Sequence, residues 1–456
     1  MPLVILALGI ALLLFLMIVL KMNGFIALVI VSVVVGMAQG MPLLATVDDK
    51  GEKVKGLLDV IQSGVGGQTG KLVLLLGFGA MLGVFMADMG AANRLATTMI
   101  NKFGIKHSQL AIVIVSFLVG VVLFYETAFV IIIPIVFAVC RAYKIPVMWL
   151  AMPMAIALST MHSFLPPHPG PSAVANMYDA SIGLTMLYGL IFAIPLGAVV
   201  AIMWPRLPFV KSVTARPPAG LVNEKEWTDE EMPGFWASLC ITALPVILIG
   251  GHAILEVTLG HEHAVTKVMA FIGHDWFALM LSLLVAVAYF GLVRKVPMDK
   301  IMASCAASVK SIAMIVFIIG GGGAFAAVLK NGGISDYILS ITENLSLSPI
   351  IIAWLIAALM RVALGSASVA VVAAVAAAGI AVPMIAGGGV SPEIMTLATA
   401  CGSIMASHVN DPGFWMFKEF LGLSVAETIK VRTTYTSLLS VLGLGACLLL
   451  SLVVPA

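Results

Sequence analysis

Long hydrophobic segments recur along the chain and alternate with short polar stretches. Such a segment crosses a hydrocarbon core when it is about 20 residues long. The pattern therefore predicts a chain of membrane-spanning helices. Stretches without Asp, Glu, Lys or Arg include residues 3–20, 180–205, 234–255, 276–293, 362–392 and 433–456.

Composition supports the membrane interpretation. Of 456 residues, 61% are hydrophobic and 10% are charged, whereas a soluble domain carries about 25% charged residues. The net charge of +2 gives no support for a nucleic-acid partner. We expect residues 3–20 to be a retained span, because no basic segment precedes them. The five cysteines are scattered, which favours small buried side chains over disulfides or metal ligands.

Two polar segments interrupt the hydrophobic pattern with proline and glycine. Residues 163–171 read SFLPPHPGP and residues 407–414 read SHVNDPGF, and their Pro-Gly pairs lie 243 positions apart. In a bilayer, a broken helix survives only where protein or a wet cavity satisfies the freed backbone groups. Paired breaks in two halves of a chain indicate the binding site of a transporter.

A spacing of 243 or 244 positions recurs elsewhere and predicts an internal duplication. A Gly-Phe-Gly-Ala segment at 77–80 matches Gly-Gly-Gly-Ala at 321–324, and the helix-stopping Gly90 matches Gly333. An amphipathic stretch follows each glycine, at 93–103 and 335–345. We predict a first membrane repeat at 1–203, a polar cytoplasmic linker at 204–233 and a second membrane repeat at 234–456.

Lysine and arginine define the topology, because basic residues favour the cytoplasmic side in short loops. A periplasmic N-terminus places the main basic groups inside and leaves the lysines of 48–55 outside. Each half then has five spans, an odd number, so the repeats are inverted in the membrane. The predicted spans are 3–20, 25–42, 72–89, 145–163, 183–204, 234–255, 276–293, 311–329, 393–408 and 434–454. The basic groups are Lys21; Arg94, Lys102, Lys106; Arg141, Lys144; Arg206, Lys211, Arg216; Arg294, Lys295, Lys300; and Lys430, Arg432.

One further segment in each half begins and ends on the same side. Residues 107–141 and 347–390 suit re-entrant hairpins, although two full spans at each place preserve the same parity. The predicted fold class is an all-α polytopic membrane protein with two inverted-topology repeats. Each repeat has a re-entrant hairpin and a broken helix, which gives 10 full spans plus two hairpins, or 12–14 hydrophobic segments.

Glu126 lies at the expected tip of the first hairpin, far from other charges. An ionisable group at membrane depth is costly and indicates function, so Glu126 is a candidate proton carrier. A loop glutamate between two complete spans is the alternative. Thr127 could cap the helix that begins there or bind substrate.

Polar side chains around the two breaks are further candidates. His162 and His168 flank the first break and could carry a proton or bond a hydroxyl-rich ligand, or they could be hydrogen-bonded core residues. His408 and Asn410 play the corresponding part in the second break. Asp411 is a second proton-carrier candidate, and it also suits a helix N-cap before Pro412.

Arg361 precedes Gly365-Ser366-Ala367-Ser368 in an otherwise uncharged stretch. Its guanidinium offers a planar fork to a carboxylate, and a helix beginning at Ser366–Ser368 would add backbone donors. These residues together predict an anion site, with an interfacial arginine as the alternative. His261-Glu262-His263 has no further ligand cluster, so we expect no metal there. The glycine runs at 320–323 and 387–389 favour close helix packing and hinges.

Several motifs resemble the gluconate permease (gluconate:proton symporter, GntP) family. They cover nearly the whole chain, and Thr46–Lys55 resembles an insertion of about ten residues. The resemblance implies import of gluconate or a close sugar acid with protons across the bacterial cytoplasmic (inner) membrane. The motifs are KMNGFIAL at 21–28, the predicted turn Gly64-Val65-Gly66-Gly67, GFGAMLG at 77–83, FYE at 124–126, FLPPHPGP at 164–171, 320–325, Gly365-Ser366-Ala367 and SHVNDPGFW at 407–415.

The sequence therefore predicts a secondary transporter and not an enzyme. The carboxylate of the sugar acid would meet Arg361, Ser366 and Ser368, and its hydroxyls would meet Thr127, His168, His408 and Asn410. Protons would couple through Glu126, Asp411 or His162. The expected partners are a small anionic sugar acid, protons and the bilayer, with the proton gradient in place of a cofactor. A homo-oligomer is compatible with the sequence. A permease for D-serine or another hydroxy acid and a membrane-embedded hydrolase are the rival interpretations.

Overall fold

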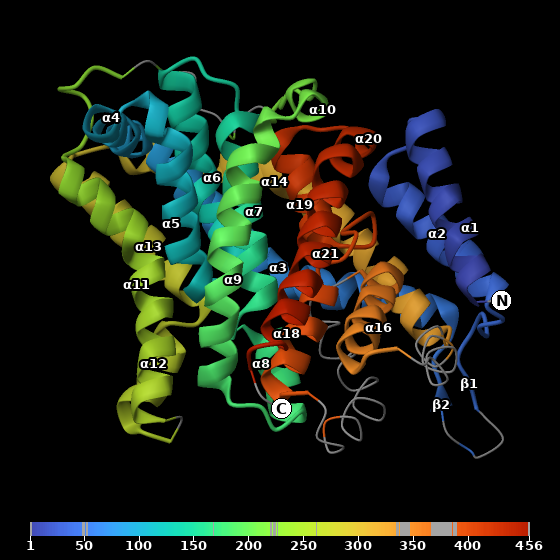
Figure 1. The fold of residues 1–456 in the computed structure, drawn as a ribbon. Helices are drawn as coiled ribbons and strands as arrows, with labels where there is room; N and C mark the ends of the chain where they lie inside the picture. The colour runs from blue at the N-terminus through green and yellow to red at the C-terminus, as the bar shows by residue number, and fades with distance from the viewer. Residues whose placement is uncertain are drawn as a thin grey trace.

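The computed structural model describes residues 2–47, 51, 53–166, 168–218, 221, 225, 227–260, 262–333, 337, 347–365, 385 and 390–454. Helices of very different lengths and tilts make up most of the described chain (Figure 1). Seven of them, in this part of the chain, are long and apolar enough to cross a membrane. The predicted count of ten full spans stays a prediction.

The first half of the chain is helical apart from one short β ribbon. Its elements are α1 (Pro2–Leu14) with a π-helical extension (Phe15–Val19), α2 (Gly24–Ala38), β1 (Thr46–Val47), β2 (Lys53–Val54), α3 (Leu57–Asp88), α4 (Ala91–Phe103), a 3-10 turn (Ile105–His107), α5 (Ser108–Val122), α6 (Tyr125–Ala142), α7 (Met148–Phe164), α8 (Pro169–Met177) and α9 (Ile182–Met203). The antiparallel β1–β2 ribbon lies in the predicted insertion and departs from an all-α fold.

The described residues of the second half are helical or lie in connecting segments. This half follows a 3-10 turn (Trp204–Arg206) and α10 (Pro208–Lys211) in the linker. Its elements are α11 (Phe235–Leu259), α12 (Ala264–Ile272), α13 (Asp275–Ala288) with a π-helical extension (Tyr289–Val293), α14 (Met298–Asn331), α16 (Pro349–Leu364), α18 (Pro392–Gly402), α19 (Pro412–Leu421), α20 (Val425–Thr428), a π-helical turn (Ile429–Thr433) and α21 (Thr434–Leu450).

The two longest helices, α3 and α14, pack against each other through glycine. A Cβ added at Gly64 would lie 2.7 Å from the Gly323 carbonyl oxygen, and one at Gly323 would lie 2.6 Å from the Gly64 carbonyl oxygen. Only residues without a side chain allow two helix backbones to approach this closely. The prediction of close packing at 320–323 is confirmed. The predicted turn at Gly64-Val65-Gly66-Gly67 is wrong, because these residues lie inside α3, which begins at Leu57.

Glycine ends both long helices, as the sequence predicts. The α3 helix ends at Asp88 and α14 at Asn331, and Gly90 and Gly333 have φ of 76° and 72°. This left-handed conformation strains residues that carry a Cβ. The amphipathic α4 follows Gly90, whereas most of 335–345 lies outside the described residues.

Both predicted helix breaks are present. The first lies between α7, which ends at Phe164, and α8, which begins at Pro169. The second lies between α18, which ends at Gly402, and α19, which begins at Pro412. Proline suits the first helical position because its fixed φ is already helical and that position needs no backbone donor. Figure 1 shows α8 beside α18 toward the lower end of the molecule and α19 nearer the upper end.

A two-residue connection joins α5 to α6 at the predicted tip of the first hairpin. Glu126 lies in the first turn of α6. Thr127 does not cap this helix: the N-cap is Phe124, without a side-chain hydrogen bond, and the buried Thr127 Oγ1 has no partner among the described residues. The matching α16 ends at Leu364, inside the predicted tip at 361–368. Residues 366–368 of this tip, and most of 369–390, lie outside the described residues.

The described parts of the linker pack against the membrane helices. Arg94 of α4 donates to the Asp229 carboxylate at 2.5 Å and to the Pro233 carbonyl at 2.8 Å. Arg294, after α13, donates to the Glu231 carbonyl at 2.7 Å. Hydrogen bonds, chiefly from Lys225, lower the pKa of the exposed Glu231 carboxyl. The linker therefore fastens helices of both halves together at one end of the molecule.

Figure 1 separates the connecting segments into two ends. The basic α4 lies with α10 and α20 at the upper end, whereas α12, the β1–β2 ribbon and the C-terminus lie at the lower end. Large apolar side chains such as Leu8, Ile191 and Ile247 are exposed around the helices between these ends. A hydrocarbon surround suits such a surface, since the largest apolar patch on a typical soluble monomer covers only about 300–600 Å².

Candidate functional site

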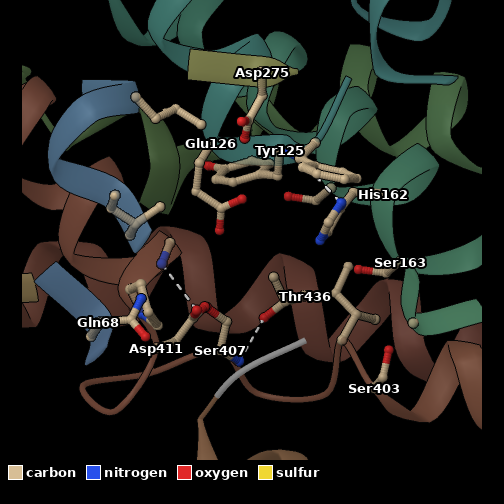
Figure 2. Close-up of a pocket in the computed structure, with 18 of the residues that line it drawn as sticks. Gln68, Tyr125, Glu126, His162, Ser163, Asp275, Ser403, Ser407, Asp411 and Thr436 are labelled. Atoms are coloured by element: carbon tan, nitrogen blue, oxygen red, sulfur yellow. Dashed lines mark hydrogen bonds between the residues drawn. The ribbon is translucent and has the colours of Figure 1, made fainter. Parts of the chain in front are cut away.

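A cavity of about 450 Å³ lies between the two breaks. This volume is within the range of small-molecule sites, about 300–1,000 Å³. Residues from both halves of the chain form it, and Figure 2 shows several of them around the open space. Its polar and charged lining consists of Gln68, Tyr125, Glu126, Ser159, His162, Ser163, His274, Asp275, Arg361, Ser403, Ser407, Asp411, Arg432 and Thr436.

Asp411 is the centre of a buried charged cluster. Its Oδ2 lies 2.6 Å from Arg361 Nη2 and 3.7 Å from Arg432 Nη2. Ser407 Oγ also donates to Oδ2, while Oδ1 accepts from the Gly413 N–H at 3.0 Å. This last contact confirms the predicted N-cap of α19. A buried charge persists only when partners and donors compensate it, and Asp411 has both.

Arg432 lies on the π-helical turn before α21 and is 3% exposed. Its Nε donates to Ser407 Oγ at 3.2 Å, and its Nη1 donates to the hydroxyls of Tyr125 at 2.5 Å and Tyr435 at 3.0 Å. Its guanidinium carbon lies 4.8 Å from the centroid of the Tyr125 ring. The sequence prediction that placed Arg432 among the basic residues outside the membrane helices is therefore wrong.

The predicted duplication contains a signal that could have placed Arg432 correctly. The position 243 residues earlier is Gly189, in the middle of α9 (Ile182–Met203). An arginine aligned with the middle of a membrane helix is a candidate for the interior of the protein. The sequence prediction grouped Arg432 with Lys430, which is exposed, and so did not use this alignment.

Arg361 has hydrogen-bonding capacity left over. Only its Nη2 is bonded, to Asp411, whereas the buried Nε and Nη1 atoms have no partner within the described part of the chain. Buried polar groups are normally hydrogen-bonded, so an exception calls for a specific explanation. Arg361 lines the cavity, and either of these two nitrogens can donate a charge-assisted hydrogen bond to a carboxylate oxygen.

Glu126 and Asp275 are the carboxylates on another side of the cavity. Figure 2 shows Glu126 beside Tyr125, with Asp275 above it. Glu126 is partly buried in the first turn of α6, and Asp275 begins α13 with its Oδ1 2.8 Å from His274 Nδ1. His274 is largely exposed, so this pair lies at the wetter edge of the cavity. Sequence reasoning did not find Asp275, because no motif marks it.

The two histidines of the first break have different positions. His162 lines the cavity, and its Nδ1 accepts the Tyr125 N–H at 3.4 Å. His168 is fully buried behind it, with ring centroids 4.9 Å apart, and its Nε2 bonds the Gly120 carbonyl at 2.8 Å. His168 does not line the cavity, and it ties the first break to the end of α5.

His408 and Asn410 similarly tie the second break to the end of α16. The Val362 carbonyl accepts from Asn410 Nδ2 and pairs with His408 Nε2, both at 2.9 Å. Gly365 completes this contact: its φ is 76°, and an added Cβ would lie 2.2 Å from the Asn410 carbonyl oxygen. His408, Asn410 and Thr127 are not among the cavity-lining residues, and Ser366 and Ser368 lie outside the described residues. Substrate binding by these five residues stays a prediction.

Hydroxyl groups form the rest of the polar lining. Ser403 Oγ donates to the Ala400 carbonyl at 2.7 Å, and Thr436 Oγ1 donates to the Thr433 carbonyl at 3.0 Å. A hydroxyl whose proton is used in this way keeps an oxygen that can accept. Ser159 and Ser163 of α7 also line the cavity. The site thus combines cationic donors with hydroxyl acceptors.

Metal ions require a set of ligating side chains close together. Within the described ranges, no group of three or more His, Cys, Asp or Glu side chains could hold a metal ion. His263 caps α12 by accepting the Val265 N–H at 3.3 Å, and His261 lies outside the described residues.

A membrane-embedded cavity between two broken helices, lined by groups of opposite charge, defines a transporter. The family model described as "GntP family permease" matches residues 1–453. The chain belongs to this family of permeases and is not an enzyme. The family resemblance predicted from the sequence is confirmed.

Individual relatives cover the whole chain. It is 48% identical over 454 residues to the high-affinity gluconate transporter of Escherichia coli (strain K12), with 100% of each chain covered. The gluconate permease of Bacillus subtilis (strain 168) is 44% identical over 464 residues, again with 100% of each covered. The Gnt-II system L-idonate transporter of E. coli (strain K12) is 44% identical over 444 residues, covering 97% of this chain and 98% of that protein. Among solved structures, the Alcanivorax borkumensis YdaH transporter has a TM-score of 0.45 at 16% identity, covering 94% of this chain and 98% of its own.

Proposed function

We propose that this permease imports gluconate, or a close sugar acid, by proton symport across the bacterial inner membrane. The observation that carries the proposal is Arg361, whose buried Nε and Nη1 lack partners among the described residues beside the cavity. Either nitrogen can donate a charge-assisted hydrogen bond to the carboxylate of a substrate. The relatives named for gluconate and L-idonate support a sugar acid as the anion.

The polyhydroxy chain of the sugar acid would lie against the hydroxyl lining. Ser159 and Ser163 of α7 and Ser403 and Thr436 of the second half are the candidates. Their oxygens would accept from substrate hydroxyls, while Arg361 donates to the carboxylate. His168, His408 and Asn410 would act by holding the two breaks in place. Thr127, Ser366 and Ser368 remain candidates for direct contact.

Glu126 is the preferred proton carrier. It lines the cavity, and the described residues provide no ion pair for it. Asp411 is the second candidate, although both arginines already compensate its charge. His162 is the third, because it lines the cavity and its Nδ1 accepts from the Tyr125 backbone. An acid that lacks a fixed partner exchanges its proton without breaking an ion pair.

Alternating access would follow from two inverted repeats, residues 1–203 and 234–456, joined by a cytoplasmic linker at 204–233. The 243-residue step supports this: α8 begins at Pro169 and α19 at Pro412, and α5 and α16 occupy matching positions before the breaks. The region of α5 to α8 and its counterpart would move relative to the flanking spans. The N-terminus would be periplasmic, and 107–141 and 347–390 would be re-entrant hairpins.

Uptake into proteoliposomes tests this function. Purified protein should accumulate labelled gluconate when the interior is alkaline, and a protonophore should abolish the accumulation. Uptake that equilibrates without accumulating would exclude proton symport, and absence of uptake would exclude gluconate. Competition by L-idonate, D-serine and shorter hydroxy acids would identify the substrate class if gluconate fails.

A further inference from the structure

We propose that Arg432 is a positioning residue that gives the buried cluster its single excess positive charge and so selects a monoanion. The inference rests on the proposed function and deepens it. The cluster consists of Arg361, Asp411 and Arg432, all buried and all lining the cavity. Two guanidinium groups and one carboxylate leave one positive charge for the substrate carboxylate to neutralise.

Arg432 differs from Arg361 in how its donors are used. Its Nε and Nη1 are occupied by Ser407 and by the hydroxyls of Tyr125 and Tyr435. Its Nη2 faces Asp411 Oδ2 at 3.7 Å, where it acts by charge more than by hydrogen bonding. Arg432 is therefore fixed in place, while Arg361 keeps two donors without a partner among the described residues.

Asp411 interacts with both Arg361 and Arg432, and this leaves Arg361 able to bind an anion. The carboxylate receives Arg361 Nη2, Ser407 Oγ and the Gly413 N–H, with Arg432 as its second cation. Without Arg432, Arg361 and Asp411 would form a closed neutral pair. An anion entering a neutral, desolvated site loses its hydration without a compensating charge.

The other charged and titratable groups around the cavity make its net charge depend on protonation. Glu126 of α6 faces the same space, together with His162 of α7 and the pair formed by Asp275 and His274 of α13. Ionised Glu126 would cancel the excess charge, and protonated Glu126 would restore it. Proton and anion would then each favour the binding of the other, which is the reciprocity that symport requires.

Arg432 also connects the cluster to the residue next to Glu126. Its Nη1 holds the Tyr125 hydroxyl at 2.5 Å, and its guanidinium stacks on the Tyr125 ring. One side chain therefore joins the start of α6 in the first half to the second break. In the first half, position 189 holds a glycine, so the first break has no equivalent charge.

The test measures equilibrium binding of labelled gluconate to purified wild type, Arg432→Gln, Asp411→Asn and the double variant. Arg432→Gln should weaken binding about tenfold or more, as expected for loss of a buried compensating charge. The double variant has the charge of wild type and should recover most of that loss. Asparagine is as good an N-cap as aspartate, so Asp411→Asn keeps the start of α19 and should bind gluconate at least as tightly as wild type.

Lys430→Gln is the matched control. Lys430 lies on the same π-helical turn but is exposed and bonded to Ser212, so its loss should leave binding unchanged. If Arg432→Gln does not purify as a folded protein, gluconate binding by Asp411→Asn alone still tests the inference. Weaker gluconate binding by Asp411→Asn, or no recovery in the double variant, would overturn the inference. Absence of gluconate binding by wild type would instead overturn the proposed function.

Discussion

The two helix breaks use the same backbone device for different purposes. In both, proline begins the second helix and the residue before it is the N-cap, His168 in the first and Asp411 in the second. His168 bonds a backbone carbonyl of α5, whereas Asp411 bonds the Arg361 side chain of α16. The first break is held by neutral contacts, and the second holds charge.

The difference shows how two similar sequence segments can contribute unlike groups to one site. Position 189 is a glycine whose added Cβ would lie 2.5 Å from Leu165 Cδ2, so the first half is closed by packing there. The equivalent position 432 is an arginine in the cavity. We infer that the second break binds the substrate anion, and that the first half supplies Glu126 and structural support.

Replacement of Arg361 should have the largest effect. Arg361→Gln removes the free donors and leaves Asp411 with one cation, a loss of about 2–5 kcal/mol for a truncated buried pair. The KM for gluconate uptake should rise by about 30-fold or more. Arg294→Gln, at an exposed arginine that holds the linker carbonyl of Glu231, is the control and should keep the wild-type KM. Normal affinity in Arg361→Gln would remove the anion site from the second break.

Replacement of Glu126 should separate coupling from binding. Glu126→Gln keeps the size of the side chain but cannot release a proton, so uphill accumulation should be lost while counterflow exchange of gluconate persists. Asp275→Asn changes another carboxylate of the cavity lining and should retain accumulation. Uphill accumulation at the wild-type level in Glu126→Gln would exclude Glu126 as the carrier.

Replacement of His168 should affect stability more than affinity. His168→Ala removes the bond to the Gly120 carbonyl and opens space next to His162. Leaving a buried acceptor unsatisfied costs about 1–3 kcal/mol, so the purified protein should unfold at a lower temperature. The KM for gluconate should change less than in Arg361→Gln. A large rise in KM without loss of thermal stability would place the substrate at the first break.

Replacement of Ser403 should have the smallest effect. Ser403→Ala removes one acceptor from the hydroxyl lining, and one hydrogen bond contributes about 0.5–1.5 kcal/mol. The KM for gluconate should rise about threefold, while a shorter hydroxy acid that does not reach Ser403 keeps its affinity. Competition assays with both acids measure this ratio. Equal losses for the two acids would show that Ser403 acts on the fold of the break.

The sequence was informative where local chemistry decides the structure. Pro169 and Pro412 predicted the breaks, Gly90 and Gly333 predicted the ends of the long helices, and Asp411 before Pro412 predicted an N-cap, because each effect acts within a few residues. Thr127 failed as a cap because α6 begins two residues earlier, at Tyr125.

Contacts between elements that are distant in the chain were not predicted from the sequence. Arg432 meets Tyr125 across 307 positions, and no local pattern reports such a pairing. Asp275 and Gln68 enter the cavity lining only through the packing of α13 and α3. The location of each charged residue was predicted from its neighbours in sequence. This placed Arg432 in a loop, although it is buried in the structure.

The central claim is that the second break binds the carboxylate of the substrate. An experimental structure of the purified protein with bound gluconate tests it most directly. The account predicts the gluconate carboxylate within hydrogen-bonding distance of Arg361 Nε or Nη1, with the polyol chain along Ser403 and Thr436. A carboxylate bound at His162, with Arg361 still bonded only to Asp411, would contradict it.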